Sequence, residues 1–363
     1  MLEEGKFSPS ILFWLITGFT FGSSVILPSG EMAEHNAWLA VILGMAEGLV
    51  FTFIYISLNH RFPEKTMVEI CETVYGSIIG KIVASLFLWY LFHLGSFVIM
   101  NFTDFFRLVS MPETPSLVFG ILITLACIYA VKHGIEVIGR CSQILVPYTI
   151  GVFILMSLLI LPKFKPENFL PFMDIPFTKL LKAGHSSGTF PFGETVAFIM
   201  IIPFLEKKKK TFITINMSLI FAGVFLVFSS LRTYGVLGNT AGIFTYPAYQ
   251  VGRLIDIGDF FSRLEIIIAI NFFTMGFLKI SVLLYGTVLG TAQLLKIQSY
   301  RILVIPVAIL MLLLSIHNFS NVPEGIIFLH NFYPIYAFPF QVIIPLMTLL
   351  IAMIRKLPGE KRS

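Results

Sequence analysis

Long apolar segments dominate the sequence, and each is close to the length that a helix needs to cross a membrane. A spanning helix needs about 20 mainly apolar residues. Only 12% of the 363 residues are charged, against about 25% in a soluble domain, so charge cannot cover a water-facing surface. Ten candidate spans lie at 11–28, 37–58, 82–108, 117–131, 142–161, 184–203, 211–237, 262–294, 301–316 and 334–354. The sequence therefore predicts one all-α domain, residues 1–363, that is integral to the membrane.

Lysine and arginine are unevenly shared between the two sides that ten spans define. With the N-terminus inside, most of the 25 lysine and arginine residues fall on the inner side, among them the run 207–210. Such an excess marks the cytoplasmic face. We therefore expect both termini in the cytoplasm. We interpret the lysine run as a solvated loop near lipid headgroups, and we expect no nucleic-acid partner.

The sequence contains no pattern typical of an enzyme, a metal centre or a cofactor site. The three cysteines have no CxxC spacing, so they predict neither a disulfide framework nor a zinc site. Metalloprotease, phosphate-loop and nucleophile-elbow motifs are absent from the sequence. The His-Ser-Ser segment 185–187 has no carboxylate close to it in sequence. We therefore expect no catalytic residues, no metal and no cofactor.

Two of the ten segments contain residues that interrupt helices. The first reads WLITGFTFGSSVILP, with Gly22 and Pro28, and the sixth reads AGHSSGTFPFGETVAF, with Pro191 and Gly193. Proline removes an amide donor and collides with the preceding turn, and glycine costs a helix interior about 1 kcal/mol relative to alanine. Unwound backbone is tolerated at membrane depth only where it lines a cavity or is buried in protein. Spans one and six are therefore predicted to be broken helices.

The two interrupted segments are the first and the sixth of ten, so each opens a set of five. This pattern is typical of transporters with inverted repeats, whose discontinuous helices point at a substrate near the membrane midplane. It predicts repeats at about 11–161 and 184–354. A simpler interpretation stays open for each break: a proline kink in the sixth span, and close packing through small residues in the first.

Four ionisable residues fall well inside predicted spans: Glu47, His93, Glu194 and Lys279. A charge at the bilayer centre is costly, so such residues are candidates for function. We expect Glu194 and Lys279 to face a common interior. They either pair directly, as a functional or purely structural ion pair, or Lys279 takes the place of the coupling cation of a transporter. Glu47 and His93 also fit a packing role, hydrogen-bonded to neighbouring helices.

The predicted outer ends of several spans carry further charged residues. Asp104 and Arg107 are spaced to pair at i, i+3. Arg232 and Arg263 fit snorkelling or loop-anchoring roles. The loop 239–260 mixes apolar residues with glycine and proline, and it either lies in the membrane interface or covers a cavity as a lid.

Several short motifs resemble those of one known family. They are FPFGETVAF and PFLEKKKKTF of span six, MAEGLVF of span two, FSRLE at the start of span eight, SSVILP of span one and RCSQILVPY entering span five. In this order they resemble the B-subunit family of spore germinant receptors, the GerAB-type proteins of the amino acid–polyamine–organocation superfamily. The sequence departs from the superfamily at Phe21-Gly22-Ser23, where relatives tend to carry Gly-x-Gly.

The resemblance implies a LeuT-like fold of five plus five helices, in the spore inner membrane. It also implies a role in sensing small germinants, commonly amino acids, together with an A-subunit and a lipoprotein C-subunit. A permease coupled to an ion or proton gradient, and a scaffold subunit with a vestigial cavity, stay open as alternatives.

Small and polar residues at the two breaks leave room for a carboxylate and an ammonium group, and Phe190 is placed to wall an apolar side chain. An amino acid fits best, although a sugar or nucleoside stays open. The predicted binding residues are Gly22, Ser23, Ser24, His93, Phe190, Gly193, Glu194 and Lys279.

Overall fold

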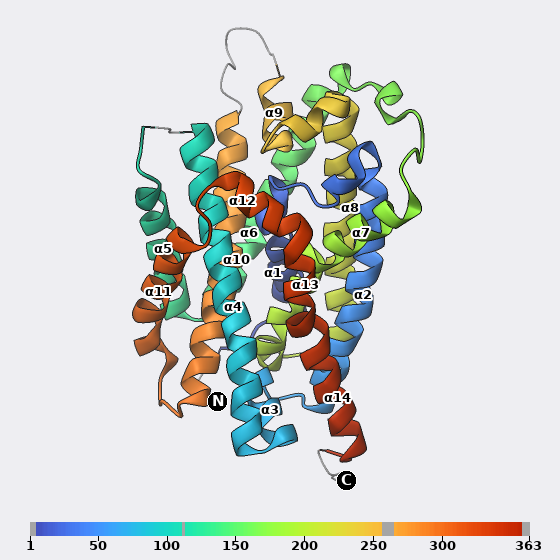
Figure 1. Ribbon diagram of the computed structural model, residues 1–363. Helices are drawn as coiled ribbons and strands as arrows, with labels where there is room; N and C mark the ends of the chain where they lie inside the picture. The colour runs from blue at the N-terminus through green and yellow to red at the C-terminus, as the bar shows by residue number, and fades with distance from the viewer. Residues whose placement is uncertain (1–4, 111–112, 256–264, 358–363) are drawn as a thin grey trace.

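The computed structural model describes residues 5–110, 113–255 and 265–357, which form a bundle of helices (Figure 1). An isolated bridge between Phe7 and Leu205 is the one extended pairing in these ranges. The α-helices are α1 Pro9–Phe21, α2 Ala37–Arg61, α3 Met67–Tyr75, α4 Ser77–Phe105, α5 Ser116–His133, α6 Ile135–Ile160, α7 Phe177–Ser187, α8 Thr211–Leu237, α9 Pro247–Arg253, α10 Glu265–Leu294, α11 Val304–His317, α12 Val322–Ile327, α13 Tyr333–Phe338 and α14 Ile344–Ile354.

Within the described ranges, 8 helical stretches are long and apolar enough to cross a membrane. They are Glu31–Arg61, Ser77–Val109, Ser116–His133, Ile135–Lys163, Thr211–Ile243, Ile266–Leu294, Tyr300–His317 and Val322–Ile354. Each corresponds to one predicted span. The two predicted spans without such a helix are the first and the sixth, because both are interrupted. The prediction of an all-α, multi-pass membrane protein with two broken helices is confirmed.

Several predicted boundaries were wrong, because hydropathy undercounts the polar ends of helices. Helix α6 begins at Ile135 instead of 142, and its first turns hold an ion pair in which Arg140 Nη2 lies 2.6 Å from Glu136 Oε1. The last stretch begins at Val322 instead of 334. The start predicted for span eight, at 262, lies outside the described residues.

The amphipathic helix α3 was not predicted, because nine residues are too short to cross a membrane. It is fixed at its start by a capping box, in which the Thr66 side chain accepts from the backbone amide of Glu69 and the Glu69 carboxylate accepts from the amide of Thr66. Both orphan amides at this end are thereby satisfied. Helix α3 is thus a short, well-defined helix that connects α2 to α4 at one end of the bundle (Figure 1).

The break after α1 is set by its glycine. Helix α1 starts with Ser8 as N-cap and Pro9 in the first turn, and it stops at Phe21. Gly22 takes φ +22°, which L side chains rarely adopt, and its N–H turns back to the carbonyl of Gly18. A single 3₁₀ turn, Gly22–Val25, follows. The segment therefore leaves α-helical geometry inside the bundle.

The sixth span is broken at the FPFG sequence. Helix α7 runs to Ser187 and widens into the π turn Gly188–Phe192, within which Phe190 is extended at φ −127° and ψ 112°. A 3₁₀ helix, Gly193–Met200, continues the chain. Pro191 has no amide to donate, so a regular α-helix cannot pass through this point.

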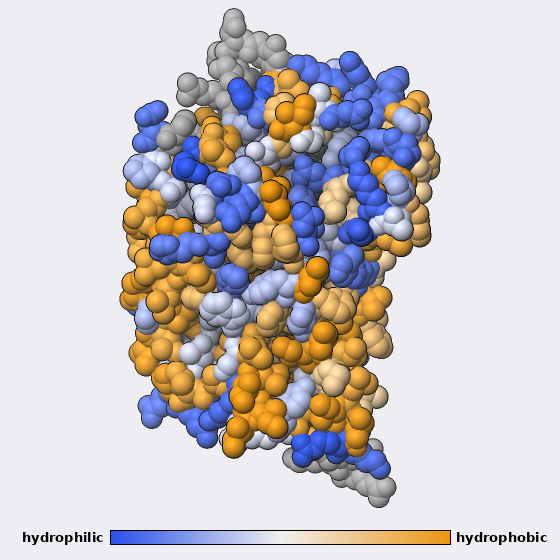
Figure 2. All heavy atoms as spheres, viewed as in Figure 1, coloured by the Kyte–Doolittle hydropathy of each residue, from blue (hydrophilic) through white to orange (hydrophobic). Residues whose placement is uncertain are grey.

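The broken segments lie in the middle of the bundle. Helix α1 packs against α6, α8 and α10, and the strongest helix pairing joins α4 to α10. The start of α1 and the end of α14 point to the same end of the molecule (Figure 1). On the face shown in Figure 2, hydrophobic side chains cover most of the middle and hydrophilic ones gather at the two ends, as a lipid-embedded bundle requires.

Candidate functional site

Glu194 and Lys279 form a fully buried ion pair at the break in the sixth span. Glu194 lies in the first turn after the break, and Lys279 reaches it from α10. Lys279 Nζ donates to Glu194 Oε2, and the two side chains are 0% and 1% exposed for Lys279 and Glu194. The two residues therefore pair directly, which is one of the alternatives that the sequence left open.

Two aromatic rings complete the surroundings of the ammonium group. Lys279 Nζ lies 5.3 Å from the ring centroid of Phe19 and 5.1 Å from that of Phe190. Both distances are within the range of a cation–π interaction. Phe19 belongs to α1 and Phe190 to the π turn, so the ammonium group links both broken spans.

The second oxygen of Glu194 is held by a hydrogen-bond chain that the sequence did not predict. Tyr333 Oη donates to Glu194 Oε1 at 2.6 Å, Tyr90 Oη lies 3.1 Å from Tyr333 Oη, and Gln341 Nε2 donates to Tyr90 Oη at 2.7 Å. Each hydroxyl has one proton, so Tyr90 donates to Tyr333 and all donors point toward the carboxylate. The signal in the sequence was the presence of Tyr90 and Gln341 inside predicted spans three and ten, with Tyr333 directly before span ten.

Gln341 and Tyr55 tie the break to its neighbours. Gln341 Nε2 also donates to the carbonyl of Thr189 at 3.0 Å, and Tyr55 Oη lies 3.2 Å from the carbonyl oxygen of Gly193 and 2.8 Å from that of Gln341. The carbonyls of Thr189 and Gly193, on either side of the break, thus accept hydrogen bonds from side chains of neighbouring helices. Unwound backbone buried in this way avoids the large cost of unsatisfied polar groups in lipid.

Two of the predicted binding glycines make room for protein side chains. A Cβ on Gly22 would overlap the side chain of Lys279, and a Cβ on Gly193 would overlap the amide of Gln341. The space beside each glycine is therefore filled by the polar network.

Glu194 also lines a small cavity of about 40 Å³. Its polar lining consists of Ser23, Asn101, Asp104, Glu194 and Tyr333, together with Tyr246 from the loop 239–260. Its apolar lining includes Leu27, Leu94, Phe97, Val98, Phe190, Phe319 and Phe328. The Ser23 hydroxyl is buried without a hydrogen-bond partner among the described residues. Both broken spans thus contribute to one cavity.

Two other predicted residues lie away from this cavity. His93 turns to Tyr336, whose hydroxyl is 2.7 Å from Nδ1, and packs on Phe97 with ring centroids 4.2 Å apart. Ser24 faces a separate cavity of about 20 Å³ beside α8. The structure therefore gathers Ser23, Phe190, Glu194 and Lys279, and it leaves His93 and Ser24 outside.

Glu47 and Asp104 also have ionisable partners. Glu47 Oε1 lies 2.7 Å from His185 Nδ1. His185 has no carboxylate near it in sequence, but Glu47 on α2 lies beside it in the fold. Asp104 Oδ1 lies 3.5 Å from Arg107 Nη2, at the predicted i, i+3 spacing. Asp104 and Glu194 both line the cavity.

Solved structures whose fold is similar to that of this chain are membrane transporters of the LeuT type. The chain is similar to MhsT in complex with L-phenylalanine, with a TM-score of 0.66 and 15% sequence identity over 97% of this chain and 99% of that one. It is also similar to MHP1, a nucleobase-cation-symport-1 family transporter, with a TM-score of 0.71 and 13% identity over 97% and 80%. The expected LeuT-like fold of five plus five helices is confirmed.

Sequence comparison defines the family. The model of the family described as "Spore germination protein" matches residues 6–322, so the chain belongs to that family. It is 27% identical to spore germination protein KB of Bacillus subtilis (strain 168), over 99% of this chain and 98% of that protein. It is 21% identical to spore germination protein XB of Bacillus anthracis, over 85% and 86%. The family resemblance predicted from the motifs is confirmed.

Proposed function

We propose that this protein is the membrane subunit of a spore germinant receptor and binds a small zwitterion, an amino acid, in the cavity above Glu194. One observation carries the proposal: Ser23 from the first break and Phe190 and Glu194 from the second line the same cavity. In this fold the substrate is expected where the interrupted helices meet.

The lining groups suit the two ends of an amino acid. The carboxylates of Asp104 and Glu194 are acceptors for an ammonium group. The unpartnered Ser23 hydroxyl and the Asn101 amide are donors for a carboxylate. Phe190 and Leu94 offer an apolar wall for a side chain.

Receptor function also requires that binding changes the conformation. The volume of the cavity is about 40 Å³, and we propose that its walls separate when an amino acid binds. A ligand that favours the separated state shifts the protein toward it, and partner subunits that contact only one state receive the signal. We propose an A-subunit and a lipoprotein C-subunit in the spore inner membrane as those partners.

Thermal unfolding of the purified protein with each of the twenty amino acids tests this function. We expect one or a few related amino acids to raise the unfolding temperature, and we expect Ser23→Leu, which fills the cavity, to abolish the shift. Phe228→Leu, on an exposed face of α8, is the matched control and should keep it. No stabilisation by any amino acid, or a shift that survives Ser23→Leu, would contradict the proposal.

An amino acid permease is the second candidate, because the similar solved structures are transporters and one of them holds L-phenylalanine. In that case Lys279 supplies a fixed cation beside the break of α1. Uptake of the stabilising amino acid into proteoliposomes separates the two functions. Binding without uptake, combined with loss of germination in a Ser23→Leu strain, favours the receptor, and uptake driven by an ion gradient favours the permease.

A further inference from the structure

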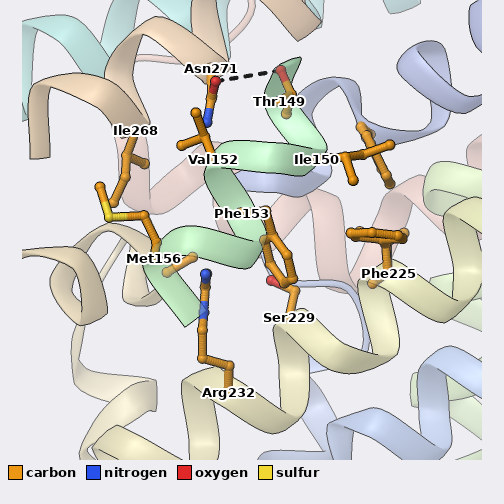
Figure 3. Close-up of a pocket in the computed structure, with 13 residues that line it drawn as sticks. Thr149, Ile150, Val152, Phe153, Met156, Phe225, Ser229, Arg232, Ile268 and Asn271 are labelled. Atoms are coloured by element: carbon orange, nitrogen blue, oxygen red, sulfur yellow. Dashed lines mark hydrogen bonds between the residues drawn. The ribbon is translucent and has the colours of Figure 1, made fainter. Parts of the chain in front are cut away.

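A second cavity lies between α6 and α8. Its volume is about 50 Å³. Its walls are mainly apolar side chains of both helices (Figure 3), and Phe21 of α1 and Ile268 of α10 also line it. At the inner end Thr149 Oγ1 donates to Asn271 Oδ1 at 3.4 Å. This cavity shares no lining residue with the proposed amino acid site.

One cation points into this apolar space. Arg232 extends from α8 toward α6 and ends beside Phe153 and Met156 (Figure 3). Its guanidinium carbon lies 4.5 Å from the centroid of the Phe153 ring, and Nη1 donates to Ser157 Oγ at 3.4 Å. The Nε atom is buried without a hydrogen-bond partner. Among the described residues, no carboxylate forms an ion pair with Arg232, although a guanidinium has five donors.

The two helices that line this cavity also carry apolar side chains on the outside of the bundle, where a bilayer covers them. Leu155 and Leu158 on α6 are 51% and 63% exposed, and Val224 and Phe228 on α8 are 41% and 58% exposed. Arg232 lies about 8 Å from the end of α8, at 1.5 Å per residue. Its guanidinium group is therefore nearer to one end of this spanning helix than to its middle.

We infer that the cleft between α6 and α8 binds an anionic phospholipid, with its phosphate on Arg232 and the start of an acyl chain against Phe153 and Phe225. A guanidinium pairs with phosphate oxygens through two parallel hydrogen bonds. Donors of Arg232 that have no partner in the protein supply these hydrogen bonds, and the rings of Phe153 and Phe225 supply the apolar contact. Since no carboxylate neutralises the cation in the described part of the chain, a lipid with net negative charge is preferred over a zwitterionic one.

Native mass spectrometry of the purified protein with added lipid tests the site. The wild type should retain phosphatidylglycerol over phosphatidylcholine. Arg232→Gln should weaken phosphatidylglycerol binding about tenfold, the factor expected for one lost charge-assisted contact. Arg232→Lys should recover part of it. Arg253→Gln, an exposed arginine outside the cavity, is the control and should bind as the wild type does.

Further variants keep the test decisive. If Arg232→Gln does not fold, Ser229→Phe fills the cavity while leaving the arginine in place, and it should lose the same lipid. Equal retention of phosphatidylglycerol by the wild type and Ser229→Phe would overturn the inference. Oleate binding that is as strong and as dependent on Arg232 would also overturn it, because the site would then recognise a fatty-acid carboxylate.

Discussion

The buried pair between Glu194 and Lys279 gives the sharpest prediction about this protein. Lys279→Met removes the cation and leaves a carboxylate that is 1% exposed and has one remaining donor, Tyr333. Removing one partner of a buried ion pair costs about 3–5 kcal/mol, because the other charge is left uncompensated. Glu194→Gln leaves an ammonium group that is 0% exposed among apolar rings, and it should cost a similar amount.

The double variant Glu194→Gln with Lys279→Met separates pairing from other effects. No charge remains buried in it, and the amide introduced at position 194 keeps an oxygen for the hydroxyl of Tyr333. We expect the double variant to lose less than half of the sum of the two single losses, which gives a coupling energy of at least about 3 kcal/mol. Replacing a buried pair as a unit is often nearly neutral, whereas breaking it is not.

A thiol-reactive dye measures these differences as unfolding temperatures in detergent. Cys71 and Cys127 are free and buried, so they react only when the bundle opens. At about 2 °C per kcal/mol for a chain of this size, each single variant should unfold roughly 6 °C or more below the wild type. Arg140→Gln, which breaks an exposed pair with Glu136, is the control and should lose at most about 1 kcal/mol. Additive losses in the double variant would refute the argument.

Three further predictions concern the surroundings of this pair and the end of the bundle. Tyr333→Phe removes the donor to Glu194 Oε1 and should lower stability by about 1–3 kcal/mol, measured by the same thiol assay; an unchanged unfolding temperature would contradict the hydrogen-bond chain. Gly22→Ala places a methyl group against Lys279 at a positive φ, so it should lower both the unfolding temperature and the amino acid response, whereas Gly242→Ala, where a Cβ meets nothing, should change neither. Thr66→Ala removes the hydroxyl of the capping box before α3 and should cost about 1 kcal/mol; hydrogen exchange should then show faster exchange confined to the first turn of α3, and exchange identical to the wild type would argue against the cap.

The sequence by itself determined the class of fold, because the membrane imposes it locally. Each span must satisfy its own backbone hydrogen bonds and must be apolar over a fixed length, and both requirements are visible in a short window of residues. The breaks were also predictable, since Gly22 and Pro191 act on their own turns. Glu194 and Lys279 stood out because a charge in an apolar segment demands a partner.

The tertiary structure alone decided which residues meet. Glu194 and Lys279 are 85 positions apart, and Glu194 and Tyr333 are 139 apart. Hydropathy and helix periodicity describe one segment at a time, so they could not place Tyr333, Tyr90 and Gln341 around the same carboxylate. For the same reason the sequence could not show that the side chains of Lys279 and Gln341 fill the space beside Gly22 and Gly193.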